Sequence, residues 1–269
     1  MTRTFLKMHG LGNDFVVFDA RRQPIALDAA TVRAIADRRT GVGCDQLIVI
    51  EPGRDGADAT MRIWNADGGE VEACGNAARC VAQVVGASAV IDTAGGRISG
   101  TSGPGGASID MGVPRFGWDE IPLAYAMDTL SMPVAWEALQ NPAAVNVGNP
   151  HVVFFVERLD AVDLARLGPI VETDPLFPHR VNVNVAEVEG RHAIRLKVWE
   201  RGAGLTRACG TGACATAVAA MRRGLVDRRV SVALPGGALD IEWRDDGRIV
   251  MTGPATTAFV GEIDLDRIG

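Results

Sequence analysis

The sequence is poor in lysine and in aromatic residues, and it carries no excess of positive charge. Lys7 and Lys197 are the only lysines among 27 basic residues, so a pyridoxal enzyme, which needs a lysine for its Schiff base, would have just two candidates. The net charge is −6 and the pI about 5.3, which leaves no basic surface to bind nucleic-acid phosphates. We therefore expect neither a pyridoxal cofactor nor a nucleic-acid partner.

Several other common features are missing as well. No run of about 18 apolar residues could span a bilayer, and the N-terminal stretch MTRTFLKMHGLGNDF does not have the pattern of a signal peptide, which predicts a cytoplasmic protein that does not enter membranes. Four histidines and five cysteines form neither a CxxC pair nor an HExxH motif, so no metal site is expected. An odd number of cysteines in a cytosolic chain of 269 residues argues against a disulfide framework.

What the chain does contain is an internal repeat. The segments WNADGGEVEACGNAARC (64–80) and WERGAGLTRACGTGAC (199–214) each place a cysteine ten residues after a tryptophan, and they lie 135 residues apart. GNDFVV (12–17) is echoed by GNPHVV (148–153), and MRIW (61–64) by LKVW (196–199). Similarities in one order at nearly constant offset predict two copies of one domain, at 1–117 and 118–256, followed by a C-terminal remainder.

Each copy reads as strand-rich with few helices, which predicts a mixed α/β (α+β) fold. Short β-branched runs bounded by Gly, Pro and Asp indicate strands, and 28–38 has the pattern of a helix capped by Asp28. The segments after the two repeated cysteines are apolar on nearly every face, so each should be a helix buried inside its own copy. The stretch 117–140 breaks the pattern and is interpreted as a connection between the domains.

A cysteine at the start of a helix is suited to acid-base chemistry. The positive end of the helix dipole lowers a thiol pKa, and the unpaired N–H groups of the first turn bind carboxylates. The glycine after each cysteine lets a carboxylate approach the backbone closely. If Cys74 and Cys209 face one carbon, one thiol can remove a proton and the other can return it on the opposite face. The sequence thus predicts inversion of a stereocentre.

Other candidate residues have plainer interpretations that remain open. Cys44, Cys80 and Cys214 are expected to be small buried hydrophobes. The asparagines of the paired GN turns could serve the turn alone. Glu200 and Arg201 could be a solvated ion pair, and His9 and His151 could be structural histidines.

The motifs as a set resemble those of diaminopimelate epimerase. KMHGLGNDF (7–15), GVGCDQL (41–47), GNPH (148–151) and RVNV (180–183), together with the two cysteine segments, occur in the expected order over nearly the whole chain. The resemblance implies two pseudo-symmetric domains, each a half-open barrel around a central helix, with the active site in the cleft between them. It also implies that the last segment, about 257–269, packs on the first domain.

The resemblance further assigns roles within a cofactor-independent epimerase of lysine and peptidoglycan precursor synthesis, which interconverts LL- and meso-diaminopimelate. Cys74 and Cys209 would be the acid-base pair, and His151 and Glu200 would support the reacting groups. The expected partner is a small amino-acid substrate, and the sequence leaves a homodimer open. The residues expected to bind the substrate are Asn13, Gln46, Asn65, Gly75, Asn76, Asn149, Asn182, Glu200, Arg201, Gly210 and Thr211.

The sequence departs from the family pattern at three positions: Ala77 stands where glycine is common, Cys44 where alanine is typical, and Leu205 where a glutamate is usual, which removes a charge near the second cysteine segment. None of the matched polar groups is lost. Two rival functions stay open. One is a related two-thiol isomerase such as a proline racemase, although Arg201 and the several asparagines favour a substrate with a second polar end. The other is a thiol switch or binding module, for which the glycines after both cysteines would be unnecessary.

Overall fold

The computed structural model describes residues 1–71, 74–103 and 105–268. These divide into two compact units: unit 1 comprises Met1–Ile109 and Gly253–Gly269, and unit 2 comprises Asp110–Thr252. The sequence repeat places the domain ends after residues 117 and 256. Glu72 and Ala73 of the first cysteine motif, and Gly269 of the last segment, lie outside the described residues.

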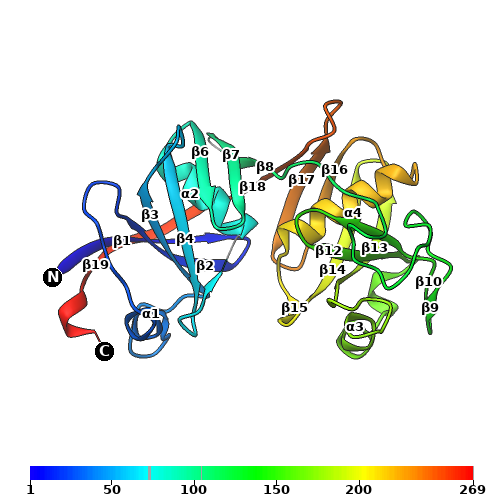
Figure 1. The fold of residues 1–269 in the computed structure, drawn as a ribbon, viewed down its shortest axis with the longest axis horizontal. Coiled ribbons are helices and arrows are strands. Elements are labelled where there is room, and N and C mark those ends of the chain that lie inside the picture. The colour runs from blue at the N-terminus through cyan, green and yellow to red at the C-terminus, as the bar shows by residue number, and fades with distance from the viewer. Residues whose placement is uncertain (72–73, 104, 269) are drawn as a thin grey trace. The chain divides into compact units, whose positions relative to one another are not determined.

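Unit 1 wraps its strands around one buried helix, α2, and carries the second helix, α1, on its outer side (Figure 1). Helix α1 begins where the sequence predicts, because the Asp28 carboxylate accepts hydrogen bonds from the backbone N–H and the hydroxyl of Thr31 at 2.8 and 2.7 Å. The helices of unit 1 are α1 (Ala29–Ala36), α2 (Gly75–Val85) and the short η2 (Leu265–Arg267). Its strands are β1 (Thr2–Gly10), β2 (Asn13–Asp19), β3 (Gln46–Pro52), β4 (Ala59–Asn65), β5 (Glu70–Val71), β6 (Ser88–Thr93), β7 (Gly96–Gly103), β8 (Gly106–Asp110) and β19 (Thr256–Asp264).

Unit 2 repeats this plan with a longer central helix, α4, drawn in yellow in Figure 1. Helix α4 contacts β11 to β14 as well as β16 and β17. The helices of unit 2 are η1 (Leu159–Ala161), α3 (Leu164–Glu172) and α4 (Gly210–Arg222). Its strands are β9 (Ala135–Trp136), β10 (Leu139–Gln140), β11 (Ala143–Asn146), β12 (Pro150–Phe155), β13 (Asn182–Gly190), β14 (Ala193–Glu200), β15 (Gly204–Thr206), β16 (Arg229–Leu234), β17 (Gly237–Trp243) and β18 (Ile249–Gly253).

Six strand pairings of unit 1 recur in unit 2. In unit 1, β1–β2, β3–β4, β4–β5 and β6–β7 pair antiparallel, whereas β2–β3 and β4–β6 pair parallel. The same sequence of antiparallel and parallel pairs joins β11 to β17 in unit 2. In each unit the central helix lies in the crossover that precedes the second parallel pair. The predicted duplicated mixed α/β fold is therefore confirmed.

The central helices are buried as their apolar composition predicts. From Gly210 to Ala220 every residue of α4 except Thr211 is buried, and in α2 burial runs from Asn76 to Ala82. Alanine and glycine side chains are small enough for strands to pack against all sides of such a helix. The start of each helix is consequently held in a fixed place within its unit.

The prediction that 117–140 connects the domains was wrong. This segment belongs to unit 2, where Ile121, Met132 and Leu139 are buried in the core cluster that also contains Phe154. The strands β9 and β10 form a small hairpin within it. The sequence pattern was misleading because the apolar residues are irregularly spaced, as they are in a loop that covers a core rather than in a helix or strand.

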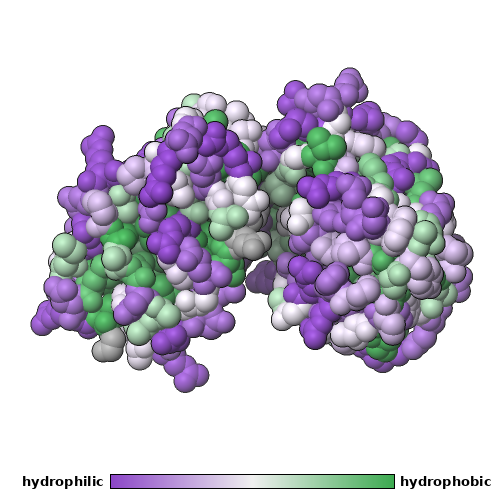
Figure 2. Space-filling model, viewed as in Figure 1, coloured by the Kyte–Doolittle hydropathy of each residue, from purple (hydrophilic) through white to green (hydrophobic). Residues whose placement is uncertain are grey.

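The chain ends meet on unit 1. Strand β19 runs antiparallel to β1, with Thr2 opposite Asp264, and the N-terminal amine forms an ion pair with the Asp264 carboxylate at 2.6 Å. Figure 2 shows hydrophobic side chains at the surface between β1 and α1, where partly buried residues cover the core of unit 1. These covering residues are Ile25, Leu27, Val42, Ile263, Leu265 and Ile268.

We expect Leu139→Ala to lower the free energy of unfolding by about 2–5 kcal/mol, because Leu139 is fully buried and its truncation leaves a cavity in the core of unit 2. Leu205→Ala is the matched control: its side chain is 51% exposed, and its loss should change stability by no more than about 0.5 kcal/mol. Urea unfolding followed by circular dichroism measures both. Equal effects of the two substitutions would mean that 117–140 is only a linker.

Candidate active site

Both central helices begin directly after a repeated cysteine. Cys74 caps α2 and Cys209 caps α4, and both caps have extended backbone conformations, with φ and ψ of −149° and 117° for Cys74 and −130° and 109° for Cys209. The first backbone N–H groups of a helix have no partner within it, so each start presents donors for an anion. Gly75 and Asn76 supply these donors in α2, and Gly210 and Thr211 supply them in α4.

In unit 1, Asn13 links Cys74 to the first turn of α2. The Asn13 side-chain oxygen accepts hydrogen bonds from the Cys74 thiol at 3.7 Å and from the Asn76 amide at 3.3 Å. Asn76 in turn accepts a hydrogen bond at 2.8 Å from Arg79, a guanidinium with no exposed surface. Three of the predicted residues, Asn13, Cys74 and Asn76, thus form one cluster.

Two further predicted residues of unit 1 form a cross-strand pair. Gln46 at the start of β3 lies opposite Asn65 at the end of β4, and its amide donates to the Asn65 side-chain oxygen at 3.0 Å. The Gln46 side-chain oxygen is buried and has no hydrogen-bond partner among the described residues.

In unit 2, Cys209 is 4% exposed and accepts a hydrogen bond from the Gly212 backbone N–H at 3.3 Å. Its sulfur also lies 3.5 Å from the Thr211 hydroxyl. Burial and the negative charge of Glu200 raise the pKa of the Cys209 thiol well above its usual value, and these effects outweigh the donors at the helix start. These effects favour the neutral thiol form of Cys209.

Three other polar residues predicted in unit 2 lie at strand ends or beside them: Asn182 begins β13, Glu200 ends β14, and Arg201 follows Glu200. Glu200 accepts a hydrogen bond from the Thr206 hydroxyl. The Asn182 side-chain oxygen accepts from the Arg201 backbone N–H at 2.9 Å. The Arg201 guanidinium is exposed and donates to the His179 carbonyl at 3.0 Å, so it lies on the surface of unit 2.

His151 is a buried, neutral donor. Its Nδ1 accepts from the Asn184 amide at 3.1 Å, so Nε2 carries the proton and donates to the Asn149 side-chain oxygen at 2.9 Å. The Asn184 amide also donates to the Val152 carbonyl at 3.0 Å, which fixes its orientation. Complete burial lowers the pKa of His151 to about 3. Asn149 then directs its amide nitrogen toward the Thr211 hydroxyl at 3.4 Å.

The remaining cysteines behave as buried hydrophobes, and all five cysteines are reduced. Burial raises the pKa of Cys44 to about 11 and that of Cys80 to about 12, so both are thiols at neutral pH. Cys214 is fully buried inside α4. At the other two positions that depart from the family pattern, Ala77 is fully buried and Leu205 is exposed.

Two polar residues of the site were not among the sequence candidates. Asp45 binds the Asn13 amide at 3.0 Å, and Asn184 orients His151. A signal for each existed: Asp45 directly precedes Gln46, and Asn184 lies two positions after Asn182, on the same face of β13.

Within residues 1–71, 74–103 and 105–268, no group of three or more His, Cys, Asp or Glu side chains is arranged to hold a metal ion. Over the same residues, no helix has the length and apolar character needed to cross a membrane.

Solved structures with the same architecture define the class of fold. A phenazine biosynthesis protein of the PhzF family from Enterococcus faecalis superposes with a TM-score of 0.71 at 14% identity, covering 98% of this chain and all of the other. A hydroxyproline epimerase from Agrobacterium vitis, with bound trans-4-hydroxy-L-proline, gives 0.67 at 17% identity over 97% and 91%. The chain therefore has the duplicated two-domain fold of these proteins.

Sequence comparison specifies the family. The family model described as diaminopimelate epimerase matches residues 5–116 and 143–258. The diaminopimelate epimerase of Erythrobacter litoralis is 63% identical over 265 residues, which cover 98% of either chain. That of Rhizorhabdus wittichii is 65% identical over 266 residues, 98% of this chain and 97% of the relative. The chain belongs to the diaminopimelate epimerase family and is an isomerase.

The neutral state of His151 makes stability depend on pH. The pKa of His151 is about 3 in the folded chain, below the 6.5 of an exposed histidine. Protonation therefore favours the unfolded chain. The contribution of neutral His151 to the free energy of unfolding is fully present above pH 6.5 and is lost as the pH falls toward 3. Between pH 6.5 and 4.5 we expect the wild type to lose about 2 kcal/mol more unfolding free energy than His151→Gln. Urea titrations at several pH values measure this difference.

The matched control for this comparison is His192→Gln, because the His192 side chain is 78% exposed. Its stability should follow the wild-type pH dependence. If His151→Gln also follows the wild-type curve, His151 is not held neutral by burial.

Proposed function

We propose that this protein interconverts LL- and meso-diaminopimelate without a cofactor, using Cys74 and Cys209 as its two acid-base groups. The observation that carries the proposal is the matched pair of helix starts, each capped by a cysteine and followed by glycine, in a chain of the diaminopimelate epimerase family. Membership of the diaminopimelate epimerase family supports diaminopimelate as the substrate. The cysteine caps support the mechanism.

In the proposed reaction one cysteine is a thiolate and the other a thiol. The thiolate takes the α-proton, and the electron pair of the broken C–H bond moves into the carboxylate. The second thiol then gives its proton to the opposite face of the carbon and becomes the thiolate, so atoms and charge balance. The raised pKa of Cys209 suits this residue to the proton-donating role in one direction.

The weak acidity of an amino-acid α-proton requires strong stabilisation of the carbanion. We propose that the N–H groups of Gly75, Asn76, Gly210 and Thr211 bind the reacting carboxylate, where negative charge develops. These donors are fixed before the substrate arrives because both helices are packed within their sheets. Exclusion of water from the site would strengthen each of these hydrogen bonds.

The other polar residues would bind the parts of the substrate that do not react. The exposed Arg201 guanidinium suits a bidentate contact with the distal carboxylate. Glu200 is close enough to Cys209 to affect its pKa, so it would act near the reacting carbon. His151 acts by orienting Asn149. The remaining side chains proposed to contact substrate are Asn13, Gln46, Asn65, Asn149 and Asn182.

The proposal extends to the setting of the reaction. The product would serve lysine and peptidoglycan precursor synthesis in the cytoplasm. The net charge of −6 argues against a nucleic-acid partner. A homodimer is the proposed assembly, supported by the exposed Phe259 and Val260 on strand β19, and sedimentation velocity would reveal it.

Incubation of the reduced protein with LL-diaminopimelate in deuterium oxide tests the function. We expect the meso isomer to form with one deuterium at Cα, with neither pyridoxal phosphate nor metal added. Exchange into proline or hydroxyproline but not diaminopimelate would assign the protein to the rival isomerases. Exchange into none of them would favour a thiol switch.

Replacing either proposed acid-base group tests the mechanism. Cys74→Ala and Cys209→Ala should each lower kcat by at least about 10²–10⁴-fold, the usual contribution of a positioned proton donor or acceptor. The matched controls are Cys80→Ala in α2 and Cys214→Ala in α4, which remove buried thiols from the same two helices. The controls should keep activity within a few-fold. Turnover by Cys74→Ala at the wild-type rate would rule out the two-cysteine mechanism.

A further inference from the structure

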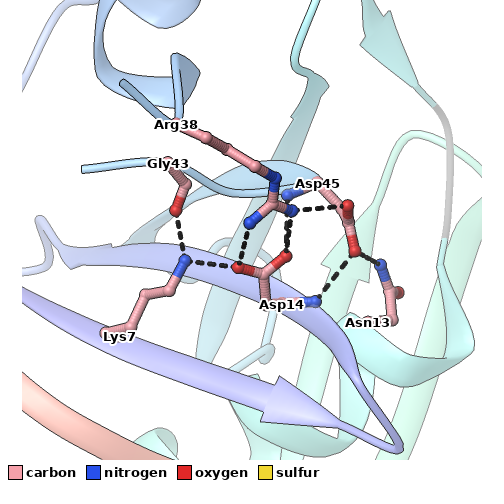
Figure 3. Close-up of polar contacts among 6 residues, drawn as sticks. All are labelled: Lys7, Asn13, Asp14, Arg38, Gly43 and Asp45. Carbon is pink, nitrogen blue, oxygen red and sulfur yellow. Dashed lines mark hydrogen bonds and ion pairs between the residues drawn. The ribbon is translucent and has the colours of Figure 1, made fainter. Parts of the chain in front are cut away.

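A network of charged and polar groups extends from the side-chain nitrogen of Asn13 (Figure 3). The Asn13 side-chain oxygen bonds to Cys74 instead. The network joins residues from β1, from β2 and from the segment between α1 and β3. Its members are Lys7, Asn13, Asp14, Arg38, Gly43 and Asp45.

Asp45 is the member that touches Asn13. One carboxylate oxygen of Asp45 accepts from the Asn13 amide nitrogen at 3.0 Å and from the Asp14 backbone N–H at 3.1 Å. The other oxygen accepts from Arg38 at 2.8 Å. A carboxylate at this place can accept only from the NH2 end of an amide, so it determines which way the Asn13 side chain is turned.

The rest of the network holds Asp45 in place. The Asp14 carboxylate accepts from Arg38 at 2.6 and 3.1 Å and from Lys7 at 2.5 Å, and it also accepts from the Asp45 backbone N–H at 3.1 Å. Burial acts to raise the pKa of Asp14, but the hydrogen bonds from Arg38 and Lys7 hold it well below its usual value. The Asp14 carboxylate therefore stays charged, and Arg38 bridges it to Asp45.

The orientation of Asn13 has a direct consequence for Cys74. With the NH2 group bound to Asp45, the Asn13 oxygen faces the Cys74 sulfur at 3.7 Å and the Asn76 amide at 3.3 Å. An oxygen can accept from the S–H group but cannot donate to a thiolate. This arrangement favours the protonated form of Cys74.

The corresponding asparagine of unit 2 is turned the other way. His151 donates to the Asn149 oxygen, so the Asn149 amide nitrogen faces Thr211 at the start of α4. The two copies thus present opposite ends of the same side chain to their helix starts. The two asparagines differ in the residue bound at the other end of the amide. Asn13 binds an acceptor, Asp45, whereas Asn149 binds a donor, His151.

We propose that Asp45, held by Arg38, is a positioning residue that turns the Asn13 oxygen toward Cys74 and thereby sets the balance between thiol and thiolate at that residue. The catalytic consequence rests on the proposed function, because it assumes that Cys74 exchanges protons with substrate. The effect of Asp45 on the protonation of Cys74 does not depend on the proposed function. Arg79, the buried guanidinium of α2, is unchanged in every variant considered below and does not contribute to their differences.

The test is the alkylation rate of Cys74 by iodoacetamide in the full-length protein from pH 6 to 10. Trypsin cleaves after Arg62 and Arg79, so Cys74 lies in a peptide that contains no other cysteine and can be quantified by mass spectrometry. In Asp45→Asn the Asn13 amide is free to turn its NH2 toward the sulfur and stabilise the thiolate. We expect the rate at pH 7 to rise about three- to tenfold, with the midpoint of the pH profile moving down.

The matched control is Asp92→Asn. Asp92 is also a carboxylate of unit 1 paired with an arginine, Arg97, at 2.7 Å, but it is not a member of the network in Figure 3. The alkylation rate of Cys74 in Asp92→Asn should equal the rate in the wild type. If Asp45→Asn also leaves the rate unchanged, the proposal is overturned.

A double-mutant cycle separates orientation from simple loss of charge. In an Asn13→Ala background, Asp45→Asn should change the Cys74 rate by less than about 1.5-fold, because the side chain through which Asp45 acts is gone. The full three- to tenfold increase in that background would mean that Asp45 acts on Cys74 through its charge, which overturns the positioning role. Should Asp45→Asn not fold, Arg38→Gln replaces it, since the Arg38 side chain is 57% exposed. A rise of at least about twofold is then expected, and no rise contradicts the proposal.

Epimerase kinetics on the same proteins distinguish the two proposals. Asp45→Asn should lower kcat while KM changes less, and should shift the pH dependence of kcat. A wild type that is inactive on diaminopimelate would refute the proposed function but leave the alkylation result to decide the role of Asp45. A kcat that is unaffected by Asp45→Asn despite faster alkylation would refute the catalytic consequence.

Discussion

The burial of one small, apolar helix within the strands of its own unit is the constraint on which the rest of the structure depends. Because α2 and α4 are enclosed, their first turns cannot shift to find other partners for their free N–H groups. Gly212 illustrates how tight the fit is, since a Cβ there would lie 2.8 Å from the Asn184 oxygen and 3.1 Å from the Val198 side chain. Rigid packing behind the helix start is what allows donors and sulfur to be held ready for a ligand.

Duplication explains the shared backbone but not the polar groups around it. At an offset of 135, the fully buried Arg79 of α2 corresponds to Cys214 of α4, so a permanent cation in one copy is replaced by a neutral group in the other. Likewise Gln46 pairs with Asn65 in unit 1, whereas Asn182 binds the backbone of the loop that follows Glu200 in unit 2. The halves keep the same secondary structure and have diverged in charge and hydrogen bonding.

Much of the fold was predictable because it follows from periodicity and local chemistry. Asp28 begins α1 through a side-chain cap, and the two cysteines precede helices whose residues are nearly all apolar. The repeat offset correctly indicated that the strand pairings would be duplicated. By contrast, Ile121, Met132 and Leu139 pack into the core of unit 2 through long-range contacts that their irregular spacing does not encode.

The site shows the same limit. Asn13 and Asn149 could be selected from the sequence because they occupy matching positions in the two copies of the repeat. Asp45 and Asn184 were not selected, because each acts through a neighbour and has no counterpart of the same type in the other copy. Their closeness in sequence to Gln46 and Asn182 was the one signal for them. Which end of an asparagine faces a sulfur depends on those neighbours, and only the assembled side chains reveal it.

The pairing of β19 with β1 sets the order in which the protein can be completed on the ribosome. Unit 2 is one continuous stretch, whereas the sheet of unit 1 needs its first strand and its last, and the N-terminal amine pairs with Asp264. During synthesis the second half of the chain therefore has all its residues while the first half still waits for an edge strand. The half that emerges first is finished last, and Cys74 lies in a unit whose sheet is complete only after β19 has been synthesised.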